Sequence, residues 1–175
     1  MPKPRKMLSD IEAPHIRSLM RLIASQSKTT IANWCISYAE VHLLPIFVKA
    51  FPGDPRPGIA LEAARDWMAG KVKLPQVKMM VLEAHAAARE AEGNPAAQAA
   101  ARAIGQSAAT VHTATHSLGL ALYGALAVAY DRIGADADWG SLSQVAADEC
   151  GKMEAALRAV SVENEPNPAK IKWNC

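Results

Sequence analysis

The sequence has little net charge and few aromatic residues. Its 19 Lys and Arg against 17 Asp and Glu give a formal net charge of +2 over 175 residues, which is too little for a dedicated nucleic-acid-binding protein. Aromatic residues make up 5% of the chain, whereas half of all residues are hydrophobic and 21% are charged. This mixture excludes an intrinsically disordered chain, and at this length it is typical of one globular domain.

Cysteine is scarce as well. Cys35, Cys150 and Cys175 are far apart, odd in number and without a C-x-x-C pair, which argues against a disulfide framework and against a thiolate metal site. The basic N-terminal residues are interrupted by polar residues and proline before an apolar stretch develops, so no secretory signal is recognisable. We therefore expect a cytoplasmic protein.

Motifs that carry chemistry are missing too. The chain has no G-x-S-x-G, no phosphate-binding glycine loop and no basic residues interleaved with aromatics, so hydrolase, nucleotide-dependent and nucleic-acid-binding functions have no positive support. No catalytic constellation is recognisable, and we expect a protein that is not an enzyme.

Alanine, in contrast, makes up about a fifth of the chain. It is the strongest helix former because it loses no side-chain entropy, but it buries little area, so alanine-rich helices must approach one another closely. The composition therefore predicts an all-α protein.

Prolines and glycines divide the chain into helices. The pattern predicts one helix after Pro14 and a second from about residue 28 to Phe51, with a kink or break near 41–44 because Pro45 lies inside it. Later helices are predicted to begin near Pro57, Pro75 and Pro95, one of them ending at Gly70. A capping box of Ser141 and Gln144 predicts the start of the last helix.

The longest uncharged stretch, residues 103–130, is long enough to require comparison with a transmembrane helix. Polar residues interrupt it, and its purely apolar part, 118–130, is shorter than the roughly 20 residues that a bilayer requires, so we expect no membrane segment. A central helix, or a broken pair of helices, explains it better.

The sequence thus predicts a single-domain bundle of about six to seven helices around an alanine-rich central helix. Its predicted parts are a flexible basic arm (1–13), the helical domain (14–162) and a C-terminal tail (163–175).

Two histidines lie within the uncharged stretch. His112 and His116 are four residues apart, which on a helix places both imidazoles on one face, and His85 or Glu83 could add a third metal ligand. No glutamate stands between the two histidines, so the H-E-x-x-H zinc-protease motif is absent. The alternative is a pair of core histidines that hydrogen-bond where small residues such as Gly119 let a second backbone approach.

Charged residues suggest a second candidate site. Asp54 and Arg56 could grip a partner or a charged ligand beside a helix N-terminus, or they could cap the turn and pin the connector through a bidentate salt bridge. Glu62 and Asp66 lie on a predicted solvent-exposed helix face that could meet a basic partner.

Several stretches carry a family resemblance. Residues 44–47, 51–70, and 84–91 together with 105–119 resemble the bacterial immunity proteins of the fifth immunity-protein-like class, the antidotes of polymorphic toxin systems. The most specific features are the Asp54-Pro-Arg56-Pro connector with Trp67 ten residues beyond it, and the pair His112 and His116. The similarity covers roughly residues 31–130. It implies an all-helical cytoplasmic protein that neutralises a cognate protein toxin by binding it.

The chain departs from this family at three places. Family members often carry a histidine at the position of Gln106 and a cysteine at that of Tyr38, and the stretch 41–43 is one residue longer here. The change at Gln106 weakens the case for a metal site, and none of the departures disturbs the apolar periodicity.

Three hypotheses follow. The first is an immunity protein that binds a toxin without catalysis or a cofactor, with Asp54, Arg56, Glu62 and Asp66 as candidate contacts. The second is a metal-binding protein or metalloenzyme that holds a divalent ion with His112, His116, His85 and Glu83. The third is a helical domain that binds a ligand or forms a homodimer through an alanine-rich face.

Overall fold

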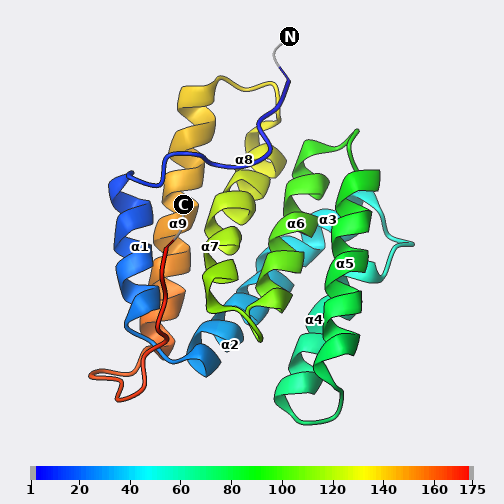
Figure 1. The fold of residues 1–175 in the computed structure, drawn as a ribbon. Helices are drawn as coiled ribbons and strands as arrows, with labels where there is room; N and C mark the ends of the chain where they lie inside the picture. Colours follow the sequence, from blue (N-terminus) through cyan, green and yellow to red (C-terminus); the bar gives the residue numbers. More distant parts are fainter. Residues whose placement is uncertain (1–2, 174–175) are drawn as a thin grey trace.

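Residues 3–173 are described by a computed structural model, and their regular structure is entirely helical (Figure 1). The elements follow in the order α1 (Pro14–Ala24), α2 (Lys28–Tyr38), η1 (Ala39–Leu43), α3 (Leu44–Ala50), α4 (Arg56–Met68), α5 (Leu74–Glu90), α6 (Pro95–Ala109), η2 (Ala114–His116), α7 (Ser117–Gly119), η3 (Leu120–Ala125), α8 (Leu126–Ile133) and α9 (Trp139–Val160). Since α2–η1–α3 and α7–η3–α8 are each continuous, the described chain forms seven helical rods. The predicted all-α bundle is confirmed.

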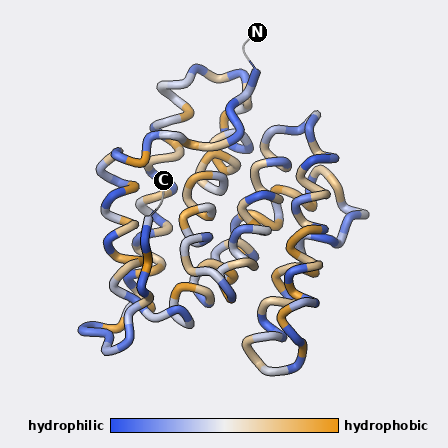
Figure 2. The backbone as a smooth tube through the Cα atoms, in the orientation of Figure 1, coloured by the Kyte–Doolittle hydropathy of each residue, from blue (hydrophilic) through white to orange (hydrophobic). Residues whose placement is uncertain are grey.

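Helix α6 occupies the centre of the bundle. It packs against α2, α3, α4, α5, α7 and α8, and most of its alanines are fully buried. Figure 2 shows apolar and neutral residues along the central helices and hydrophilic residues in the arm, the tail and the loops. The alanine-rich face is therefore used inside the fold, where small side chains let neighbouring backbones approach.

Several predicted helix ends are confirmed. Asn94 accepts a hydrogen bond from the Ala97 amide at the start of α6, and Gly70 ends α4 with a φ of 74°, which favours glycine. The prediction for the last helix was wrong, because α9 begins at Trp139 with Asp138 as its cap, whose Oδ1 accepts from the Ser141 amide. Asp138 can cap this end as well as serine can, and it stands three residues earlier.

Pro45 produces a π-helical turn rather than a break. The turn η1 directly precedes it, and α3 begins with proline in its first turn, where no amide donor is required. A π-helical turn holds one residue more than an α-helical turn. This fits the extra residue in the stretch 41–43 relative to the family that the sequence resembles. A second π-helical turn, η3, faces it: an added Cβ at Gly124 would lie 2.9 Å from a Leu43 methyl group.

The uncharged stretch 103–130 forms two helical segments separated by a turn. This broken pair of helices was the second of the two predicted alternatives. Helix α6 ends at Ala109, the chain reverses through residues 110–113, and it returns as α7–η3–α8. The prediction that His112 and His116 share one helix face was therefore wrong, because His112 lies in the turn.

Both ends of the described chain contact the bundle. The Leu8 amide donates to the Leu122 carbonyl (2.9 Å), and the Arg5 guanidinium lies 3.8 Å from the Trp139 ring centre. In the tail, the Ala169 amide donates to the Gln26 carbonyl (2.8 Å). Residues 3–13 thus contact the bundle through Leu8 and Arg5, while the flexibility of the arm and the domain boundaries stay predictions. Residues 1–2 and 174–175, including Cys175, lie outside the described residues.

One described helix is long and apolar enough to cross a membrane. It is the rod Lys28–Ala50, whose most apolar 18 residues have a mean hydropathy of 1.3. Of these 18 residues, 56% are buried inside the bundle. A core helix meets the same test, so this is weak evidence for a membrane segment. The predicted absence of a membrane segment stays a prediction.

Candidate functional site

A buried carboxylate lies between α2 and α9. The side chain of Glu149 is 2% exposed, and its Oε1 accepts a 2.6 Å hydrogen bond from the hydroxyl of Tyr38. Its Oε2 accepts from Nη2 of Arg132 (3.2 Å) and lies 3.8 Å from Nζ of Lys152. A buried charge is tolerated only when it is paired and hydrogen-bonded, and this network supplies both.

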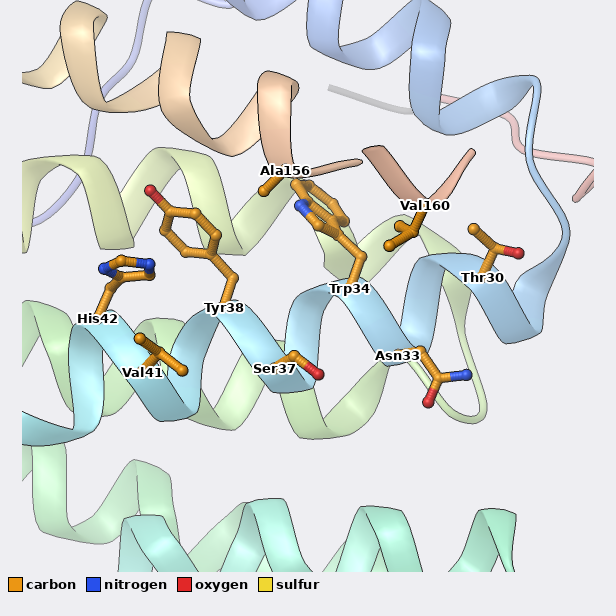
Figure 3. A pocket seen from close by; sticks show the side chains of 9 residues that line it. All are labelled: Thr30, Asn33, Trp34, Ser37, Tyr38, Val41, His42, Ala156 and Val160. Atoms are coloured by element: carbon orange, nitrogen blue, oxygen red, sulfur yellow. The ribbon is translucent and has the colours of Figure 1, made fainter. Parts of the chain in front are cut away.

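Beside this network runs a surface groove of about 490 Å³, which we call the α2–α9 groove. The rings of Trp34, Tyr38 and His42 follow one another along one side of the α2–η1 rod, and Ala156 and Val160 of α9 stand opposite (Figure 3). The full lining is Thr30, Asn33, Trp34, Ser37, Tyr38, Val41, His42, Ala156 and Val160. Aromatic walls with a few polar groups are typical of ligand-binding clefts.

A second hollow of about 240 Å³ also has His42 in its lining. His42 lines both hollows, and its ring lies 4.3 Å from that of Tyr38, centre to centre. The second hollow carries charge: Lys49 pairs with Asp131 (3.1 Å), and Arg132 and Glu149 line it as well. The two hollows therefore lie on either side of His42, one with a mostly apolar lining and one lined by two pairs of opposite charge.

Burial controls the acid–base behaviour of this region. It raises the pKa of the Tyr38 hydroxyl well above its ordinary value of 10.0, and the hydrogen bond to Glu149 raises it further. Burial also raises the pKa of the neighbouring Cys150 thiol to about 12, with a smaller contribution from the Glu149 charge. Both groups are thus protonated at neutral pH, so Tyr38 is a hydrogen-bond donor and Cys150 is an unreactive thiol.

The sequence analysis did not predict this site, although the sequence of α9 contains a pattern that indicates it. The buried positions of α9 recur at helical spacing, and one member of that apolar series is charged. The series is Leu142, Ala146, Glu149, Cys150, Met153 and Leu157. A carboxylate on the core face of a helix requires a buried partner. The sequence could not identify that partner as Tyr38, which is 111 residues away.

The structure places Asp54 and Arg56 in one ion-pair network. Nε and Nη2 of Arg56 both donate to the Asp54 carboxylate (2.9 and 2.6 Å), and Nη1 donates to Oε1 of Glu90 on α5 (3.1 Å). The Arg56 hydrogen bond lowers the pKa of Asp54 below its ordinary 3.8. This is the bidentate salt bridge that was one of the two alternatives, and it ties the connector to α5. A contact of these residues with a partner stays a prediction.

Glu62 and Asp66 both lie on α4, four residues apart. Glu62 is exposed, and Asp66 is half-buried with its Oδ1 3.5 Å from Nζ of Lys71. Between them, Arg65 pairs with Glu40 of η1. The predicted acidic face therefore exists as a mixed-charge surface with Glu62 as its most accessible acid.

The predicted histidine cluster is brought together in part. Nδ1 of His116 donates to Oε1 of Gln106 (2.7 Å), and the rings of His112 and His116 meet edge to face at 5.7 Å. His85 of α5 packs against α6 at Gly105, where an added Cβ would lie 2.7 Å from the ring. Burial lowers the pKa of all three histidines, so neutral imidazoles are favoured. The cluster is thus a half-buried, hydrogen-bonded packing element.

The geometry does not support the metal hypothesis. Across residues 3–173, no three or more His, Cys, Asp or Glu side chains are grouped so that they could hold a metal ion. Glu83 is exposed on α5 and forms no group of possible metal ligands with the three histidines. The hydrogen bond of His116 to Gln106 uses Nδ1 and leaves Nε2 available, so it is the missing third grouped ligand, and not this contact, that leaves the metal hypothesis without support.

Comparison with known proteins places the chain in a family. Residues 21–156 match the family described as "Imm-5 like putative immunity protein". No curated protein and no solved structure matches the chain. The matched range covers well over half of the sequence and runs from the end of α1 through most of α9, including Tyr38 and Glu149. The chain therefore belongs to the Imm-5 like putative immunity protein family.

Proposed function

We propose that this protein is an immunity protein that binds and neutralises a cognate bacterial toxin in the cytoplasm, without catalysing a reaction. The observation that carries the proposal is the family match over residues 21–156. Inhibition by binding requires a stable scaffold and an accessible surface. The central helix α6, packed on all sides, supplies the first.

The outer side of α4 is the proposed contact surface. Glu62 is exposed there, and Asp66 and Arg65 flank it, so the surface offers charged groups that can steer a partner of opposite charge. Asp54 and Arg56 stand at the start of the same helix, where their salt bridge fixes the connector geometry. A basic toxin surface would complement Glu62 and Asp66.

Co-expression in a bacterial host tests the proposal. A candidate cognate toxin domain is expressed from an inducible promoter, with and without the chain, and colony survival is counted. We expect the chain to restore survival by several orders of magnitude. A matched arm expresses an unrelated helical protein at the same level. If the toxin kills equally in both arms while the chain is soluble and abundant, the proposal fails.

A further inference from the structure

A small hollow lies between the N-terminal arm and the first half of α6, and bases outnumber acids in its lining. The arm descends beside this part of α6 (Figure 1), and we call the space between them the arm–α6 hollow. Its lining is Lys3, Pro4, Arg5, Lys6, Glu92, Pro95, Gln98, Ala99 and Arg102. Four of these residues are basic and only Glu92 is acidic, so the hollow carries surplus positive charge.

The one acid in this lining is already paired. Nζ of Lys3 lies 3.3 Å from Oε1 of Glu92. Arg5, Lys6 and Arg102 form no salt bridge within residues 3–173. The Arg5 guanidinium stacks on an indole ring, which leaves Lys6 and Arg102 as the bases of the hollow with neither an ionic nor an aromatic partner in the described chain.

Arg102 is half-buried, and its guanidinium donates to no acceptor in the part of the chain that the structure describes. A guanidinium has five N–H donors, and removing them from water without acceptors costs free energy. Among the described residues, no buried side-chain nitrogen lacks a hydrogen-bond partner, so the N–H groups of Arg102 reach solvent. An anion that enters the hollow can therefore accept hydrogen bonds from them.

The surroundings of Arg102 are electrostatically positive as well. Burial lowers the pKa of His85 on the neighbouring α5, and the positive charges of Arg89 and Arg102 lower it further. Within the described chain, no acid contributes to this shift. A positive field that no nearby acid offsets attracts anions.

The arm is held in place on both sides of Lys6. The Tyr130 hydroxyl donates to the Arg5 carbonyl (2.9 Å). The Leu8 amide donates to the Leu122 carbonyl (2.9 Å). The backbone of Lys6 is therefore fixed against the bundle, and less conformational freedom is lost when its ammonium group pairs with an anion.

The volume of the hollow, about 40 Å³, limits the ligand to a small group. One water requires about 10–15 Å³ in the same measure, so the space has room for about three waters. This is enough for the oxygens of one tetrahedral anion and too little for an aromatic ring.

We propose that the arm–α6 hollow binds a single phosphate dianion, either as the free ion or as the end group of a small phosphorylated compound. Arg102 and Lys6 donate to its oxygens, because a guanidinium fork matches the geometry of phosphate and an ammonium group adds a compact charge. Its two negative charges offset the surplus positive charge of the lining. This activity is separate from toxin binding through α4.

An NMR titration measures binding at the hollow. Inorganic phosphate, methyl phosphate and acetate are each titrated into the isotope-labelled full chain at neutral pH and constant ionic strength, and the backbone amide signals of residues 98–102 are followed. We expect both phosphates to shift these signals saturably, with a Kd below about 1 mM. Acetate should bind at least about fivefold more weakly, because it carries less negative charge and fewer acceptor oxygens.

The order of the two phosphates distinguishes the sources of the ligand. Tighter binding of methyl phosphate identifies a phosphorylated compound, and tighter binding of inorganic phosphate identifies the free ion.

Variants locate the site. Arg102→Gln should weaken phosphate binding at least about tenfold, and Arg102→Lys, which keeps the charge but not the fork, should lie between this variant and the wild type. Lys6→Gln should lower the affinity several-fold. Arg21→Gln is the matched control, because Arg21 is exposed on α1 and does not line the hollow. Circular dichroism and thermal unfolding establish that each variant is folded.

Four results would overturn the proposal. One is equal affinity for acetate and phosphate, which would indicate that the surplus charge selects no anion. Another is unchanged phosphate affinity of the folded Arg102→Gln variant. The third is the absence of saturable shifts in the wild-type chain up to about 10 mM phosphate. The fourth is tighter binding of a short single strand of thymidine nucleotides than of methyl phosphate, lost in Arg102→Gln, which would assign the hollow to a nucleic-acid backbone.

Discussion

The hydroxyl of Tyr38 on α2 donates a 2.6 Å hydrogen bond to the carboxylate of Glu149 on α9, whose side chain is 2% exposed. This contact joins two rods that are more than a hundred residues apart in the sequence. It also fixes the tyrosine ring that forms part of the floor of the α2–α9 groove. Stability and the shape of the groove therefore depend on the same pair.

Removing the Tyr38 hydroxyl should destabilise the fold. Tyr38→Phe leaves Glu149 buried with one hydrogen-bond donor fewer, and the loss of a hydrogen bond to a charged group costs about 2 kcal/mol. Equilibrium urea denaturation measures the change in the free energy of unfolding.

Tyr123→Phe is the control for this variant. Tyr123 is half-buried, and its hydroxyl makes no hydrogen bond with any residue between 3 and 173, so a change within about 0.5 kcal/mol is expected. Equal effects of Tyr38→Phe and Tyr123→Phe would show that the Tyr38 contact does not stabilise the fold.

Local rules predicted most of the fold. Asn94 with Pro95 marks a helix start, and Gly70 marks a helix end, because capping and backbone preferences act over a few residues. The π-helical form of the turn before Pro45 could not be predicted, since it depends on how η1 packs against η3. The start of α9 was misplaced because Asp138 and Ser141 are both good caps, and only the folded chain selects between them.

The salt bridge of Arg56 should contribute modestly to stability. Arg56→Gln removes the bidentate contact with Asp54 and the contact with Glu90, and at side-chain exposures of 20–26% for the Arg56–Asp54 pair we expect a loss of about 1 kcal/mol. Arg65→Gln breaks the more exposed pair with Glu40 and should cost less than about 0.5 kcal/mol. The midpoints of urea denaturation of both variants test this prediction. A larger loss of stability for Arg65→Gln than for Arg56→Gln would contradict it.

Close helix packing at Gly119 should not tolerate a methyl group. An added Cβ would lie 2.6 Å from the Cβ of Gln106, so Gly119→Ala must push α7 away from α6 and should cost about 1–3 kcal/mol. Gly151, in the middle of α9, has open space around it, and Gly151→Ala should stabilise the protein by about 0.5–1 kcal/mol. Thermal unfolding should therefore shift in opposite directions, and a stabilising Gly119→Ala would refute the close approach.

Alkaline pH should unfold the protein through its buried thiol and phenol groups. Well below pH 9.0 the Cys150 thiol is protonated in both states, so its contribution to stability is fully present. As the pH rises toward about 12, the thiol ionises in the unfolded chain but not in the folded one, and stability falls by about 1.4 kcal/mol per pH unit.

Cys150→Ala isolates this contribution. Urea denaturation from pH 8 to 11 under reducing conditions measures the free energy of unfolding of both proteins. After subtraction of the difference between them at pH 8, the free energy of unfolding should fall less steeply with pH for the variant. The buried Cys35 thiol, whose pKa is also raised by burial, maintains part of the slope in both proteins. Parallel slopes for the two proteins would contradict the raised pKa of Cys150.

The candidate site was less predictable than the fold. His112 and His116 stand at helical spacing in the sequence, but the chain reverses between Ala109 and Ala114, so spacing alone gave the wrong geometry. Asp54 and Arg56 are close in sequence, and their bidentate pairing was foreseen as one of two alternatives. A site assembled from α2, α8 and α9 depends on tertiary packing, which no local pattern encodes.

Reversing charge on α4 should weaken toxin binding. The double variant Glu62→Lys, Asp66→Lys replaces two acids with bases, and against a basic surface we expect a loss of affinity of at least about tenfold with unchanged helicity. The control, Asp136→Lys with Glu163→Lys, makes the same charge change at exposed positions in the α8–α9 loop and the tail. Equal affinities for both double variants would remove α4 from the interface.

Titration of the purified toxin domain with the purified chain tests the central claim most directly. Calorimetry measures the complex, and toxin activity is assayed at each ratio. We predict saturable binding at one chain per toxin, with activity falling in proportion to the complex formed. Full toxin activity in the presence of excess folded chain, with no heat of binding, would contradict the assignment of this protein as an immunity protein.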